Sequence, residues 1–287
     1  MKLLNAKQIC NVAAAKGFGV PALNNNGGSY DIGRAIIESA EELQSPLIIQ
    51  CYEPNLEYCG FDYAGQLIRF LAADTTIPMA IALDHGKTPE SVFRAVKAGF
   101  THVMIDYADQ PLEKNIRGTQ EIINIVRPLG ISVEAEIGHI IKSSDASSQR
   151  APKVSVEEAK EFTAKVDVDL LAVAVGSTHG IFKEQHGLDF KLISKIRAAV
   201  KPPLVQHGTC GISLADISRV VKAGMTKINF GEGLRMNYIR YFNEFSQTLN
   251  HEHHVWRIAR AAKDRLKKDI KEIIRAVGSE GKAGLFK

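Results

Sequence analysis

Short apolar runs alternate with longer amphipathic stretches along most of the chain. The short runs are nearly continuous in branched apolar residues, which is typical of parallel strands buried on both faces, and the longer stretches repeat every three or four residues, as helices do. The predicted strands are residues 19–24, 46–51, 78–85, 102–107, 132–138, 170–176, 203–207 and 227–231. The predicted helices include residues 29–43, 89–98, 112–127, 156–166 and 214–223, several of which end at a glycine. This order predicts an α/β fold, a closed (β/α)₈ TIM barrel.

Two segments depart from the alternation. Residues 139–153 form the longest stretch without periodicity, which is typical of a lid or an irregular loop. Residues 232–277 read as helical, with a break at residues 251–254, and are longer than one barrel helix requires. We therefore expect an additional C-terminal helix that packs on the barrel or on another subunit. A length of 287 residues suits one barrel, so residues 1–287 are predicted to be a single domain.

The composition argues against several classes of function. The chain is 45% hydrophobic and 24% charged with a net charge of +4, and its basic residues mix with acidic ones, as in residues 263–269, which argues against nucleic-acid binding. The four cysteines follow no regular spacing, and the sequence contains neither a secretory signal nor an apolar run of about 20 residues. These features predict a cytoplasmic protein with reduced thiols and no membrane partner.

Three histidines, His85, His179 and His207, each end a predicted strand and precede a glycine. The carboxyl ends of all barrel strands meet at one mouth, so the three imidazoles are expected to converge there. A single histidine at such a position is as often a hydrogen-bonded structural residue as a metal ligand. Three imidazole ligands and one open position are typical of catalytic zinc, so the set predicts one catalytic Zn²⁺.

Carboxylates accompany these histidines. Asp84 is expected to point to the other side of the strand from His85, so it is not assumed to bind the same ion and can instead face the substrate as a general acid or base. A helix cap or a buried ion pair is the alternative. Asp106 and Glu136 end neighbouring strands, where a buried acid is costly without a cation, and they predict a second or alternate metal position.

Glycine-rich turns follow the last two predicted strands, at residues 208–213 and 229–233. In this fold these two loops often hold a phosphate group with backbone N–H groups at a helix N-terminus. Ordinary turn chemistry is the alternative reading.

These motifs, in this order, resemble the class II, metal-dependent ketose-bisphosphate aldolases, which act on fructose and tagatose bisphosphates. The resemblance runs through residues 20–24, 83–86, 99–106, 132–138, 169–180 and 227–229 to residues 278–283, and so covers nearly the whole chain. It implies an aldehyde-lyase that reversibly cleaves a ketose phosphate or related ketose into dihydroxyacetone, free or phosphorylated, and an aldehyde. Family members are commonly dimers or tetramers.

The resemblance also implies roles for individual residues. His85, His179 and His207 would hold the zinc ion, Asp84 would transfer the proton, and Asp106 and Glu136 would serve a second cation, divalent or monovalent. No lysine is needed for a Schiff base. With the two glycine-rich turns, the resemblance predicts a substrate-binding set of Asn24, Gln50, Gly180, Gly208, Thr209, Cys210, Asn229, Phe230, Gly231 and Glu232.

The chain departs from the family at the substrate end. The family usually has a hydroxyl residue at Cys210, a threonine at Glu232 and often a serine near Tyr52, and its lid usually carries a glutamate where residues 139–153 hold only Asp145. Glutamate and phosphate repel each other unless Glu232 turns away, caps its helix or pairs with Arg235. An unphosphorylated or acidic sugar therefore stays open as the substrate. Two other hypotheses are a metal-dependent hydrolase or isomerase on the same barrel, and a non-catalytic sugar-binding or scaffold protein.

Overall fold

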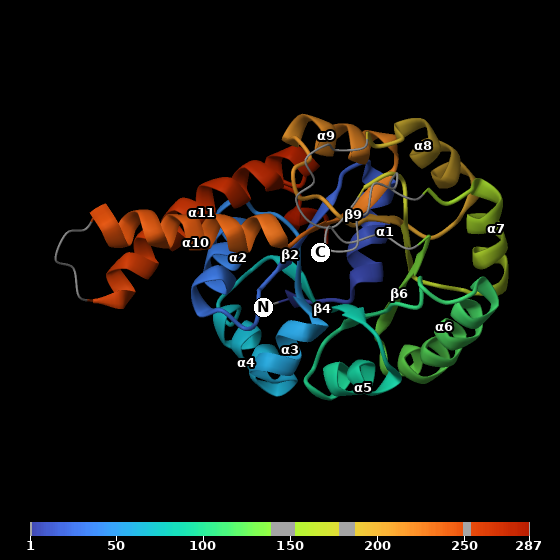
Figure 1. Cartoon of the computed structure of the whole chain (residues 1–287), viewed down its shortest axis with the longest axis horizontal. Helices are drawn as coiled ribbons and strands as arrows, with labels where there is room; N and C mark the ends of the chain where they lie inside the picture. Colours follow the sequence, from blue (N-terminus) through green and yellow to red (C-terminus); the bar gives the residue numbers. More distant parts are fainter. Residues whose placement is uncertain (1, 139–152, 178–186, 249–253, 287) are drawn as a thin grey trace.

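Eight parallel strands form a closed ring with helices around it (Figure 1). The structure is a computed structural model that describes residues 2–138, 153–177, 187–248 and 254–286. The ring consists of β2 (Val20–Asn24), β3 (Leu47–Tyr52), β4 (Pro78–Gly86), β5 (His102–Ile105), β6 (Ser132–Ile137), β7 (Leu170–Val173), β8 (Leu204–Gln206) and β9 (Met225–Phe230). Pairing of β9 with β2 and of β4 with β5 closes it. The predicted TIM barrel is confirmed, and each predicted strand has its counterpart.

Helices follow the strands in the expected alternation. They are α2 (Tyr30–Glu42), a short α3 (Glu53–Cys59) before α4 (Phe61–Leu71), α5 (Pro89–Lys97), α6 (Leu112–Val126), α7 (Val156–Lys165), α8 (Phe190–Ala199) and α9 (Leu214–Ala223), with 3₁₀ turns at Arg127–Leu129 and Ala283–Leu285. Side chains of Ser29, Thr88, Ser155, Asp189 and Ser213 accept N-cap hydrogen bonds, which start five of these helices. The larger apolar core lies between the strands and these helices.

The chain begins with two elements that the hydrophobic pattern did not predict. β1 (Lys2–Leu3) pairs with the start of β4, and α1 (Ala6–Lys16) follows it. Ile9, Cys10 and Ala13 of α1 are buried with small residues from inside the strands, such as Ala22 and Ala80. Because β1 and α1 lie at the amino-terminal side of the strands, they close that end of the barrel interior. The opposite mouth is left for the site.

Two helices at the carboxyl end complete the fold. α11 (Val255–Val277) packs against α2, α9 and β2, which is the place of the helix that follows the eighth barrel strand. α10 (Glu232–Thr248) packs on α11, and the pair projects beyond the outline of the barrel (Figure 1). The prediction of an additional helix in this region is confirmed. None of the described helices has the length and apolar character that crossing a bilayer requires.

The contact between α4 and α5 provides a test of barrel packing. A Cβ on Gly65 of α4 would overlap the backbone oxygen of Ala98, the residue that follows α5. Gly65→Ala should therefore lower the free energy of unfolding by about 1–3 kcal/mol, measured by denaturant unfolding. Gly233→Ala on α10, where an added Cβ meets nothing within 4 Å, is the matched control and should be neutral or slightly stabilising. An unchanged stability in Gly65→Ala would contradict the packing described.

Candidate active site

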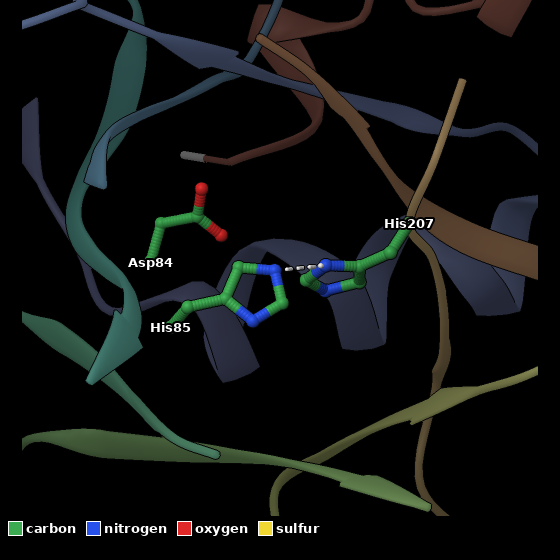
Figure 2. A group of neighbouring side chains, drawn as sticks. All are labelled: Asp84, His85 and His207. Atoms are coloured by element: carbon green, nitrogen blue, oxygen red, sulfur yellow. Dashed lines mark hydrogen bonds between the residues drawn. The ribbon is translucent and has the colours of Figure 1, made fainter. Parts of the chain in front are cut away.

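Two of the three predicted imidazoles meet at the carboxyl-terminal mouth of the barrel. His85 lies near the end of β4 and His207 directly follows β8, on the opposite side of the ring. Figure 2 shows the two rings pointing toward each other, and His85 Nε2 lies 3.0 Å from His207 Nδ1. His207 is buried and His85 is nearly so. His179 and Gly180 lie outside the described residues.

The outer nitrogen of each ring faces a carboxylate. His85 Nδ1 lies 2.7 Å from Asp106 Oδ2, and His207 Nε2 lies 2.9 Å from Glu134 Oε1. An ionised carboxylate only accepts hydrogen bonds, so both outer nitrogens carry hydrogen and donate. In two neutral rings, Nε2 of His85 and Nδ1 of His207 would then present lone pairs to each other. Only a proton or a cation between them makes this arrangement favourable, and imidazoles backed by carboxylates are typical of metal ligands. The donor set therefore fits a divalent ion.

The surrounding carboxylates favour a positive charge at this point. Burial acts to lower the pKa of His85, but Asp84 and the hydrogen bond to Asp106 outweigh it and raise the pKa to about 9. Burial acts to raise the pKa of Asp106, but His85 and Lys87 hold it far below its usual value. A proton and a divalent ion would thus compete for His85.

Asp84 lies on the same side of the strand as His85, and the prediction that the two point to opposite sides is wrong. Asp84, His85 and His207 each offer a ligating atom within 4.8 Å of the others, and their side chains converge in Figure 2. The reason is local: His85 has φ +55°, and the register between β4 and β5 shifts between Leu83 and Gly86. This irregularity breaks the alternation of side chains that a regular strand imposes.

Two amides orient the Asp84 carboxylate. Asn24 Nδ2 donates to Asp84 Oδ2 at 3.0 Å, and Asn229 Nδ2 is 3.4 Å from Asp84 Oδ1. The carboxylate is almost fully buried and faces the imidazole pair. It is thus held in a fixed position beside the place where a divalent ion would be bound.

The predicted second metal group is also brought together. His85, Asp106 and Glu136 offer ligating atoms within 4.8 Å of one another. In this structure, however, Asp106 Oδ2 also lies 2.7 Å from the ammonium nitrogen of Lys87. Lys87 was not among the residues predicted from the sequence.

A buried ionic network behind His207 was also missed. Glu134 Oε2 accepts from Lys227 Nζ at 2.9 Å and lies 3.2 Å from His102 Nε2, while Glu134 Oε1 faces His207. Glu134 and His102 are fully buried and Lys227 is nearly so. Burial acts to raise the pKa of Glu134, but Lys227, His102 and His207 hold it well below its usual value. Charged residues at buried positions of two strands, Glu134 in β6 and Lys227 in β9, were the available sequence signal.

The predicted substrate residues that the structure describes lie at the same mouth. Gln50 is buried within β3, two residues before its end, and no described residue hydrogen-bonds to its Oε1. The Thr209 hydroxyl donates to the backbone oxygen of Asn229, so it links the two glycine-rich turns. Phe230 ends β9 and Gly231 follows it, with the Cβ of Asn24 nearby.

Two of the departures from the family, Cys210 and Glu232, lie close enough for the charge of Glu232 to act on the thiol, whereas Tyr52 lies beside His85 with its ring centroid 6.0 Å from that of the imidazole. Glu232 pairs with Arg235 at 3.3 Å, one of the alternatives that the sequence left open. Burial, followed by the charge of Glu232, raises the pKa of the Cys210 thiol. A cavity of about 320 Å³ lies between the turns that follow β7 and β8, and Ser177, Gly208 and Cys210 contribute to its lining. Asp145 and the rest of residues 139–152 lie outside the described part of the chain.

A TIM barrel with imidazoles and an oriented carboxylate at its mouth is suited to metal-assisted acid–base catalysis. Over residues 4–282 the chain matches the family described as fructose-bisphosphate aldolase class-II, and it belongs to that family. The family reaction is reversible cleavage of a ketose phosphate into dihydroxyacetone phosphate and an aldehyde, so the chain is an aldehyde-lyase of the class II type.

Individual relatives cover the chain almost completely. It is 32% identical to a sulfofructosephosphate aldolase of Alkalicoccus urumqiensis, over 100% of both chains, and 32% identical to a fructose-bisphosphate aldolase of Geobacillus stearothermophilus, over 99% of each. Among solved structures, the YdjI aldolase of Escherichia coli K12 superposes with a TM-score of 0.86 at 30% identity, covering 98% of this chain and 99% of that one.

Proposed function

We propose that residues 1–287 form one cytoplasmic domain, a zinc-dependent aldolase that assembles as a homodimer or homotetramer and acts on a ketose phosphate. One observation carries the proposal: His85 Nε2 and His207 Nδ1 face each other at 3.0 Å while both outer nitrogens donate to carboxylates. Together with His179, these rings would hold Zn²⁺ with one position open. The ion would act as a Lewis acid that polarises the ketose carbonyl and stabilises the negative charge left by cleavage.

Asp84 carries the proton transfer in this proposal. Its carboxylate takes the proton from the hydroxyl on the carbon that becomes the aldehyde, and the adjacent carbon–carbon bond breaks. The electron pair of that bond passes to the other fragment, which becomes dihydroxyacetone phosphate after it takes up a proton. Asn24 and Asn229 keep the carboxylate aimed at the reacting hydroxyl, because each donates to one of its oxygens. In the synthetic direction Asp84 returns the proton.

The two glycine-rich turns would receive the phosphate group. Gly208 has a positive φ of 67°, which suits a turn that exposes backbone N–H groups, and Gly231 precedes α10. Arg235 offsets the charge of Glu232, so this acid does not by itself exclude an anion. An acidic group elsewhere on the ketose is the second candidate, since one relative is named a sulfofructosephosphate aldolase.

The test does not require the sugar to be known. Incubating the protein with dihydroxyacetone phosphate in D₂O should exchange a carbon-bound hydrogen for deuterium, measured by NMR, because the final proton uptake by this fragment runs in reverse and then forward with solvent deuterium. A chelator should abolish the exchange and added Zn²⁺ should restore it. A panel of ketose phosphates, acidic ketoses and free ketoses, with both fragments quantified, then identifies the substrate. Exchange that persists in chelator would contradict the proposal. A hydrolase or isomerase would give no pair of carbonyl fragments, and a non-catalytic protein would give neither exchange nor products.

A further inference from the structure

Lys87 is held in a defined position beside the site. It directly follows β4, two residues after His85. Its backbone N–H donates to Glu53 Oε2 at 2.7 Å, and its side-chain ammonium donates to Asp106 Oδ2 at 2.7 Å. The side chain is about half as exposed as a free one, with 43% relative exposure, while Asp106 is buried. The ammonium therefore approaches the buried carboxylate from the solvent side.

Both carboxylate oxygens of Asp106 already accept hydrogen bonds. Its Oδ2 accepts from both His85 Nδ1 and Lys87 Nζ, and its Oδ1 accepts from the backbone N–H of Ala108. Since His85 Nδ1 carries the donated hydrogen, that nitrogen has no lone pair for a cation. The group of His85, Asp106 and Glu136 has the spacing of a cation site, but two of its members are committed to hydrogen bonds.

The charges at the mouth also disfavour a second divalent ion beside Asp106. Asp84, Asp106 and Glu136 carry three negative charges within one group of side chains linked by His85. One divalent ion at the imidazole pair and one ammonium at Asp106 balance them. A second divalent ion would leave an excess of positive charge at a partly buried site and would be repelled by the ammonium, which at close range weakens binding by at least about 100-fold.

We propose that Lys87 takes the place of a second divalent cation at the carboxylates of Asp106 and Glu136, so that each active site holds one ion. This inference rests on the proposed function, because it assumes an ion at His85 and His207. Lys87 is then a positioning residue: it holds Asp106, which in turn fixes the His85 ring with Nε2 toward His207.

The experiment counts ions in the full-length protein. The metal-free protein is titrated with Zn²⁺ and with Mn²⁺, and bound ions per chain are measured by calorimetry and elemental analysis. Wild type should bind one ion. Lys87→Ser, which removes the charge and opens space, should bind two, and the electron paramagnetic resonance spectrum of its Mn²⁺ form should show two coupled ions. Lys87→Arg keeps the charge and should bind one.

Further variants locate the second ion and guard against misfolding. Lys87→Met keeps the length of the side chain and should also bind two ions, so it serves if Lys87→Ser does not fold. Adding Asp106→Asn to Lys87→Ser should return the count to one. A single ion in both neutral variants, or two ions in wild type, would overturn the role of Lys87 and leave the aldolase proposal standing. No ion in wild type would instead contradict the proposed function itself.

Discussion

Asp84→Asn should lower kcat for ketose cleavage by about 10²–10⁴-fold, because the amide cannot accept the proton of the reacting hydroxyl. The substitution keeps the shape of the side chain, and its remaining oxygen can still accept from one of the two amides, Asn24 or Asn229. Metal content and KM should change little, because the two facing imidazole nitrogens are untouched. Steady-state kinetics of the metal-loaded variant provide the measurement.

The control for this variant is Asp109→Asn. Asp109 is an exposed carboxylate in the turn after β5, and its replacement should leave kcat unchanged. Full activity in Asp84→Asn would rule out Asp84 as the proton acceptor. A loss of metal in Asp84→Asn would indicate instead that Asp84 is a ligand, which its proximity to His85 and His207 makes a necessary check.

Glu134→Gln should destabilise the protein and weaken its metal binding together. It leaves the ammonium of Lys227 buried without a counter-charge, and losing one partner of a buried ion pair costs about 3–5 kcal/mol of unfolding free energy. It also replaces the carboxylate that accepts from His207 Nε2, and such changes behind a metal ligand cost roughly 10–100-fold in affinity. Denaturant unfolding and metal titration measure the two effects.

A double variant separates the two roles of Glu134. Glu134→Gln combined with Lys227→Met removes both buried charges, so most of the lost stability should return. The metal affinity should stay low, because His207 still lacks its carboxylate partner. If affinity recovers along with stability, Glu134 supports only the fold and does not orient His207.

The barrel could be predicted because its strands follow a local rule. β7 is wholly apolar, β3 and β4 are apolar up to Gln50 and Asp84, and each strand is buried along nearly its whole length. α1 was not predicted because only Ala6, Ile9, Cys10 and Ala13 of it are buried, and they pack with residues of strands that lie far apart in the sequence. Such packing has no signature within the helix itself.

The site was predictable only in part. A histidine before a glycine at a strand end pointed to His85 and His207, and the structure places both at the mouth. The orientation of Asp84 could not be predicted, because it depends on the positive φ of His85 and on a register shift between β4 and β5. Glu134, Lys227 and Lys87 act through partners that lie far away in the chain or across a turn, and no spacing rule brings those together.

A crystal structure of the protein with Zn²⁺, with the ion located by its anomalous scattering, would show directly whether His85 and His207 hold the catalytic metal. We expect one ion bound by His85 Nε2, His207 Nδ1 and a nitrogen of His179, each at about 2.0–2.1 Å, with Asp106 and Glu134 still accepting from the outer ring nitrogens of His85 and His207. An ion bound elsewhere, or bound through His207 Nε2 with Glu134 displaced, would contradict this expectation.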